Sequence, residues 1–271
     1  MSGQAAPRMA SPLGEALAPP FVWAHRGASA LEPENTLAAF ARAAELAADG
    51  IELDVQLSAD GVAIVVHDPV LYHDGAAFHL RRPAGVDARP VFVGTVDAAE
   101  LTGEPVVFPD GRRARLARLE EVLAGLPAWM WLDVELKAGW VYDARLTGVV
   151  ASLLRARPER CLVSSFDHVV LAEMCRHAPD VPRAALCDAR LVDAVAVLAS
   201  VPAEMWNVRR AFVTRDDVVA LRERGVGVSV YGEEVRYQMA ELSTWPLAGV
   251  FLDDPRDGRA VASEVPPSAP R

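Results

Sequence analysis

Short apolar runs alternate along this chain with segments whose apolar residues recur every three or four positions. The run at 21–24 has the length of a buried strand, and the 36–48 segment has the spacing of an amphipathic helix. Pro33 precedes this helix, and either Asn35 or Thr36 is expected to cap it. A strand followed by a helix is the unit that the rest of the chain repeats.

The alternation predicts an α/β fold. Strands are expected at 21–24, 51–57, 62–66, 129–136, 161–166, 184–187, 205–208, 226–231 and 250–252, and helices at 36–48, 119–126, 144–155, 169–177, 191–199, 215–224 and 234–242. Strands that alternate with helices over this length are typical of a (β/α)8 TIM-type barrel. An open doubly wound sheet is the alternative, but no GxGxxG turn follows the first strand.

Nine predicted strands compete for the eight positions of such a barrel. The segments 51–57 and 62–66 are joined by Asp60-Gly61, which is a hairpin signal, so the surplus strand is expected within this 51–66 pair. The 72–115 segment is rich in proline and glycine and shows no clean helical pattern, which indicates a small insertion after the strand that ends in His67-Asp68. We expect one catalytic barrel domain at 21–260, between flexible tails at 1–20 and 261–271.

Composition and charge narrow the function classes. The chain has 271 residues and a formal net charge of −10, which argues against a nucleic-acid partner because phosphate backbones need a basic face. Three cysteines without a CxxC motif, and a start without a secretory pattern, favour a reducing cytoplasmic location. No apolar run is long enough for a transmembrane segment. The oligomeric state leaves no signal in the sequence.

Polar residues gather at the ends of the predicted strands, where barrel enzymes carry their chemistry. The first strand ends in His25-Arg26, and the hairpin return ends in His67. Glu52 and Asp54 stand two apart on one strand and therefore share a face. Asp133, Glu135 and Lys137 repeat this spacing on another strand, and Lys137 is the one lysine among 27 basic residues.

These residue types suit phosphate chemistry. Glu52, Asp54 and Glu135 together would offer an all-oxygen site, which favours Mg²⁺ or Ca²⁺ over zinc. Two histidines beside a cation suit acid and base roles near neutral pH. Arg26 and Lys137 would meet the anionic oxygens of a phosphate. Any one of these features alone is more often a solvated strand face or a turn, but four of them at strand ends indicate a functional site.

The ordered motifs resemble a known family. The set that carries the resemblance is His25-Arg26-Gly27, Pro33-Glu34-Asn35-Thr36, Glu52-x-Asp54, Asp60-Gly61, His67-Asp68, Glu135-Leu136-Lys137, Ser164-Ser165-Phe166 and 249–255. This set is similar to the signature of the glycerophosphodiester phosphodiesterases, and the likeness runs from about 22 to 258.

The resemblance implies a TIM-type barrel that hydrolyses glycerophosphodiesters to glycerol 3-phosphate and an alcohol. It assigns the divalent cation to Glu52, Asp54 and Glu135, acid/base catalysis to His25 and His67, and phosphate contact to Arg26 and Lys137. Water or a glycerol hydroxyl remains open as the nucleophile. The chain departs from the family pattern at His73, 117–120, 231–234 and Leu252, and we expect these departures to surround the alcohol-binding rim.

Two other functions fit parts of the pattern. A lysophospholipase D-like phosphodiesterase would use the same barrel, and an apolar mouth built by the 72–115 insertion would favour it. A non-catalytic phosphate-binding module would be favoured by the loss of a ligand or a histidine, and none of the expected ones is missing.

Overall fold

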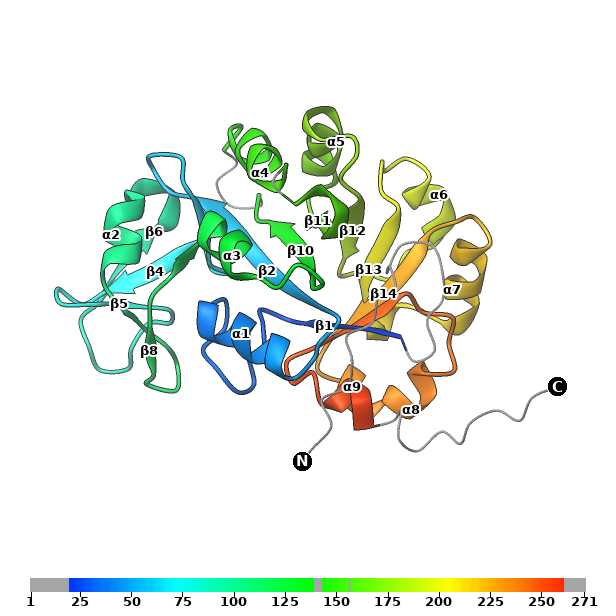
Figure 1. The fold of residues 1–271 in the computed structure, drawn as a ribbon, viewed down its shortest axis with the longest axis horizontal. Coiled ribbons are helices and arrows are strands. Elements are labelled where there is room, and N and C mark those ends of the chain that lie inside the picture. The colour runs from blue at the N-terminus through cyan, green and yellow to red at the C-terminus, as the bar shows by residue number, and fades with distance from the viewer. Residues whose placement is uncertain (1–19, 139–142, 156, 261–271) are drawn as a thin grey trace.

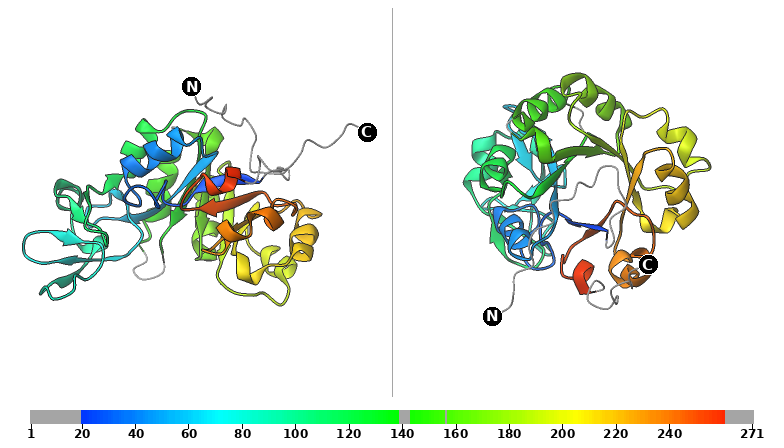
Figure 2. Two further views of the ribbon diagram at one scale, coloured as in Figure 1. Left: turned by 90° about the horizontal axis from the view of Figure 1, so that it is seen from below. Right: turned by 45° about the vertical axis from the view of Figure 1, so that its right-hand side comes forward.

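The computed structural model describes residues 20–138, 143–155 and 157–260. Eight parallel strands close into the predicted barrel, because the last strand pairs with the first as well as with its predecessor (Figures 1 and 2). In order around the ring they are β1 (Phe21–Ala24), β2 (Gly50–Leu57), β10 (Trp131–Leu136), β11 (Cys161–Ser165), β12 (Arg183–Cys187), β13 (Met205–Arg209), β14 (Gly227–Tyr231) and β15 (Gly249–Leu252). The tails predicted at 1–20 and 261–271 lie outside the described residues, apart from Pro20.

Helices surround the strands, as the right-hand view of Figure 2 shows. They are α1 (Leu37–Glu45), α3 (Leu119–Gly125), α4 (Leu146–Leu154), α5 (His168–His177), α6 (Ala194–Leu198), α7 (Arg215–Arg222), α8 (Met239–Leu242) and α9 (Asp257–Ala260). Each helix predicted from the pattern is present, but most are shorter than expected. The segment at 234–242 divides into a 3-10 turn and α8, because the Gln238 N–H bonds to the Val235 carbonyl, three residues back, at 3.0 Å.

The surplus strand is the predicted hairpin return. β3 (Ala63–Val65) pairs antiparallel with β2, and Gly61 in the connecting turn has a φ of +82°, a conformation that favours glycine. A two-residue strand, β9 (Ala117–Arg118), then pairs antiparallel with β3. The hairpin therefore brings the chain back beside β2 and delivers His67 to the same end of the barrel as Glu52.

The insertion is more ordered than the sequence pattern indicates. A second sheet of β4 (Val70–His73), β5 (Phe78–His79), β6 (Arg89–Phe92), β7 (Val106–Val107) and β8 (Arg113–Ala114) stands at one side of the barrel (Figure 1). The expectation that this segment holds no helix is wrong, since α2 (Ala98–Gly103) forms there. A helix of six residues is too short to show a helical repeat of apolar residues in the sequence. Tertiary contacts stabilise α2, because Ala98 and Leu101 are buried in a separate apolar cluster with residues of the second sheet.

The barrel interior is apolar toward the amino ends of the strands and polar toward their carboxyl ends. Along β10, alternate residues face the same side, so Trp131, Asp133 and Glu135 rise toward the mouth in sequence. Trp131 belongs to a buried cluster with Trp23 of β1 and other barrel-strand residues, which confirms that it packs in the core. The polar layers above this cluster are where the candidate site lies.

The cysteines are free thiols, and they differ in burial. Burial raises the pKa of Cys161 to about 12, whereas Cys175 and Cys187 are partly accessible. Because the thiolate is the reactive form, we expect a thiol reagent at pH 8 to leave Cys161 unmodified in the native protein and to modify it after unfolding in guanidinium. Mass spectrometry of the labelled peptides measures this, and native labelling of Cys161 as fast as that of Cys175 would contradict it. The cytoplasmic location inferred from the cysteines stays a prediction.

Within the described residues, no helix is long and apolar enough to cross a bilayer.

Candidate active site

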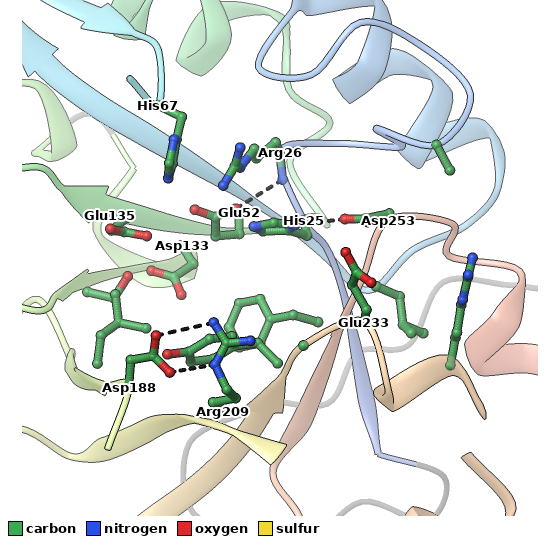
Figure 3. A pocket seen from close by; sticks show the side chains of 18 of the residues that line it. His25, Arg26, Glu52, His67, Asp133, Glu135, Asp188, Arg209, Glu233 and Asp253 are labelled. Atoms are coloured by element: carbon green, nitrogen blue, oxygen red, sulfur yellow. Dashed lines mark hydrogen bonds and ion pairs between the residues drawn. The ribbon is translucent and has the colours of Figure 1, made fainter. Parts of the chain in front are cut away.

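A cavity of about 660 Å³ opens at the carboxyl ends of the barrel strands. Six of the seven side chains proposed from the sequence line it, namely His25, Arg26, Glu52, His67, Glu135 and Lys137. Figure 3 labels the first five of them. The seventh, Asp54, is 1% exposed and lies behind them, in contact with Arg26 and Lys137. The cavity is therefore the place where all of the candidate chemistry meets.

Three carboxylates form the centre of the site. β2 and β10 run parallel, and their register sets Asp54 opposite Glu135 and Glu52 opposite Asp133. One oxygen from each of Glu52, Asp54 and Glu135 lies within 4.8 Å of the other two. Such a group of buried oxygens can hold a hard divalent cation.

Glu52 is the least compensated member of this group. Burial raises its pKa well above the usual range, and the nearby Asp54, Glu135 and Asp133 raise it further. Its Oε2 accepts the Arg26 N–H at 3.0 Å, but Oε1 is buried and has no hydrogen-bond partner among the described residues. An unpartnered carboxylate oxygen among like charges fits a site that is completed by a cation.

Two basic side chains compensate the other carboxylates. Lys137 Nζ lies 2.8 Å from Asp54 Oδ1 and also contacts Glu135 Oε1, and Arg26 Nε lies 3.3 Å from Asp54 Oδ2. Burial alone would raise the pKa of Asp54, but Lys137, Arg26 and His67 outweigh it and hold that pKa far below its usual range. Asp54 is thus ionised at neutral pH, as a cation ligand must be.

The turn after β1 aims its backbone at the carboxylates. Arg26 has a φ of +55° and Gly27 a φ of +80°, and a side chain at Gly27 would meet the Ala39 carbonyl carbon at 2.7 Å. Asn35 also has a positive φ, of 58°, and its amide donates to Asp54 Oδ2 at 2.7 Å. The strained turn therefore serves the site, because it directs both Arg26 and Asn35 at buried acids.

Each histidine of the site is oriented by a carboxylate. His25 Nδ1 lies 2.7 Å from Asp253 Oδ1, and His67 Nδ1 lies 2.6 Å from Asp68 Oδ1. The Nε2 atom of each ring is thereby left as the one that can exchange a proton with a ligand. Figure 3 shows His25 and His67 on the same side of the cavity as Glu52, with Asp253 beside His25.

The sequence did not single out Asp253, Asn35 or Asp133 as parts of the site. Asp253 follows β15, and the parallel register that aligns Ala24 with Leu252 brings it beside His25. Closure of the barrel is the signal that would have found it. Asp133 accepts from the Asn207 amide at 3.2 Å, and burial raises its pKa.

The departures from the family pattern only partly surround the cavity. Tyr231, Gly232, Glu233 and Leu252 line it, as expected. The expectation is wrong for the other two departures. His73 lies in β4 of the second sheet, and 117–120 forms β9 and the start of α3. None of the cavity-lining residues that the structure describes belongs to the 72–115 insertion.

A closed eight-stranded barrel with acids, bases and histidines at its mouth defines a TIM-barrel enzyme. The model of the glycerophosphoryl diester phosphodiesterase family matches residues 25–257. The chain belongs to this family, whose members hydrolyse glycerophosphodiesters.

Individual relatives agree with the family model. A glycerophosphodiester phosphodiesterase of Caldanaerobacter subterraneus is 30% identical over 241 residues, which cover 86% of this chain and 94% of that protein. The crystal structure of such an enzyme from Agrobacterium tumefaciens is 26% identical, with a TM-score of 0.72 over 89% of this chain and all of that one. An Oleispira antarctica phosphodiesterase in complex with sn-glycerol-3-phosphate shares the fold, with a TM-score of 0.75 at 23% identity over 90% of this chain and 97% of that one.

Proposed function

We propose that this enzyme hydrolyses glycerophosphodiesters to glycerol 3-phosphate and an alcohol by histidine acid/base catalysis beside a divalent cation. The observation that carries the proposal is the carboxylate group at adjacent register positions of β2 and β10, with its unpartnered Glu52 oxygen. Glu52, Asp54 and Glu135 would hold Mg²⁺ or Ca²⁺. When bound, the cation would polarise the phosphate and offset charge that develops on its oxygens.

The two histidines divide the proton transfers. One of His25 and His67 takes a proton from the nucleophile, and the other gives a proton to the leaving alcohol oxygen. Asp253 and Asp68 support these roles, because each fixes one ring nitrogen and stabilises the protonated ring. Each ring is oriented by a carboxylate at its Nδ1 atom, so either ring can serve as the acid or as the base.

Arg26 and Lys137 are the proposed phosphate contacts. Both remain charged at neutral pH: burial would lower each pKa, but Asp54 raises both, together with Glu34 for Arg26 and Glu135 for Lys137. The Arg26 side chain is 16% exposed and that of Lys137 19%, so both reach the cavity from buried stems. Fixed cations in a partly desolvated site stabilise the charge of the reacting phosphate.

The substrate assignment agrees with the relatives. The Caldanaerobacter relative carries the name of this activity, and the Oleispira barrel holds the product that we propose for this chain. We further propose that the barrel and its second sheet, at 21–260, act as one catalytic domain on a small-molecule substrate, with no nucleic-acid partner. None of the described residues that line the cavity belongs to the insertion, so we do not propose the lysophospholipase D-like activity that an apolar mouth built by the insertion would favour.

Lys137 gives a test of the phosphate assignment. Changing Lys137→Arg is expected to lower turnover about ten- to a hundredfold, because a planar guanidinium does not fit the space that an ammonium occupies between Asp54 and Glu135. Steady-state kinetics with a glycerophosphodiester measures the loss, and thermal unfolding checks that the variant folds. Near-normal turnover in a folded variant would show that the sole lysine has no special role.

A further inference from the structure

The wall of the cavity that faces the candidate cation site is built from three neighbouring strands. Asp188 follows β12, Arg209 ends β13 and Tyr231 ends β14, and these strands are paired in that order. Figure 3 shows the Asp188–Arg209 pair across the cavity from His67. A diester bound at the carboxylates would therefore extend one of its alcohols toward this wall.

The side chains of the wall hold one another in place. Arg209 donates from Nε to Asp188 Oδ1 at 2.5 Å and from Nη2 to Oδ2 at 3.2 Å. Its guanidinium carbon lies 5.5 Å from the centre of the Tyr231 ring, and the Tyr231 hydroxyl donates to the Cys187 carbonyl at 3.0 Å. The polar groups are thus preorganised before any ligand arrives.

The wall also has exposed polar atoms that a ligand can bind. The side chains of Asp188 and Arg209 are 47% and 39% exposed, and Arg209 Nη1 makes no hydrogen bond to another described residue. Phe166, after β11, is 49% exposed and lies edge-on to Tyr231 with 6.3 Å between ring centres. Donors, acceptors and an exposed aromatic ring therefore meet on one surface of the cavity.

This combination matches a polyol better than an amine. Neighbouring hydroxyls both donate and accept, so they pair with a carboxylate and a guanidinium held side by side, while the C–H face of a polyol packs on an aromatic ring. A quaternary ammonium group would seek an aromatic face, but the Tyr231 ring already lies against the Arg209 guanidinium, whose fixed charge repels it.

We propose that Asp188, Arg209, Tyr231 and Phe166 form a subsite for a polyol head group. This inference rests on the proposed function and names its substrate class, glycerophosphodiesters whose second alcohol is a polyol. Arg209 and Asp188 bind the hydroxyls, and Phe166 supports the carbon skeleton. Glycerophosphoglycerol and glycerophosphoinositol are suitable probes of this class, and glycerophosphocholine and glycerophosphoethanolamine probe the amino alcohols.

The test compares kcat/KM for these four probes in the wild type and in Arg209→Met. Loss of a charged hydrogen-bond donor is expected to lower kcat/KM for the two polyol diesters about tenfold more than for the two amino-alcohol diesters. Phe166→Ala, an exposed position that tolerates substitution, is expected to give a selective loss of about threefold. Arg145→Met is the matched control, because Arg145 also makes a forked pair, with Asp143, but does not line the cavity.

The outcomes separate this inference from the function on which it rests. A selective loss on the polyol probes supports the subsite. An equal loss on all four probes would overturn it, since the wall would then bind the glycerol that they share. The absence of a loss on any probe would overturn it as well. If the wild type released glycerol 3-phosphate from none of the four, the proposed function would fail together with the subsite.

Discussion

Replacement of His25 or His67 by alanine is expected to lower kcat by about 10²–10⁴-fold, because each residue supplies one of two proton transfers. KM is expected to change much less, since Arg26, Lys137 and the carboxylate group still bind the phosphate. Steady-state kinetics on one glycerophosphodiester, with the cation in excess, measures both constants. The two single variants should show losses of similar order, because each removes one of the two proton transfers.

The chain offers a matched control for these variants. His79 pairs with Asp74 at 2.7 Å in the second sheet, so it reproduces the histidine–carboxylate contact outside the cavity. Its side chain is 14% exposed. We expect folded His79→Ala to keep wild-type turnover. An undiminished kcat in His25→Ala would remove that residue from the mechanism.

The second large effect concerns Asp54. Changing Asp54→Asn is expected to lower cation affinity and turnover by at least about a hundredfold, since it removes the ionised ligand that contacts both Lys137 and Arg26. Isothermal titration with Mg²⁺ and with Ca²⁺ measures affinity without reference to activity. Glu45→Gln, at an exposed position of α1, is the control and should bind the cation as the wild type does. Equal affinity in Asp54→Asn would place the cation elsewhere.

Glu52 adds a dependence on pH to the same site. Its folded pKa lies above its unfolded value, because of burial and then the charges of Asp54, Glu135 and Asp133. Without the cation, the wild type therefore loses stability as pH rises from the pKa of Glu52 in the unfolded chain through its pKa in the folded protein. Glu52→Gln lacks this loss, so it should unfold at a higher temperature than the wild type at pH 8 without cation, and the difference should shrink toward pH 4. A constant difference across that range would contradict the account.

Local patterns in the sequence predict most of the barrel. Asp60-Gly61 identifies the hairpin, and the spacing of Glu52 with Asp54 places two acids on one face of β2. The register that sets Glu135 opposite Asp54 could not be read from the chain, because the strands lie about eighty residues apart and their pairing depends on the whole ring. The same holds for Asp253 beside His25, which needs the barrel to close.

The insertion shows the limit of periodicity. Its strands have two to four residues, and α2 has six, which is too few to display a repeat. Their order comes from a buried cluster that includes Leu71, Phe78 and Leu101, contributed by segments that are distant in sequence. The cavity wall could not be predicted either. Asp188 and Arg209 have no distinctive local sequence, and they become a pair only through the register of β12 and β13.

Analysis of the reaction products shows whether this protein is a cation-dependent glycerophosphodiester phosphodiesterase. The purified protein, stripped of metal and then supplied with Mg²⁺ or Ca²⁺, is incubated with a panel of glycerophosphodiesters and followed by phosphorus NMR. The account predicts conversion of at least one diester to glycerol 3-phosphate with an equal amount of free alcohol, loss of this conversion in chelator, and its absence in Asp54→Asn. No glycerol 3-phosphate from any diester with either cation, or an unchanged rate in chelator, would contradict it.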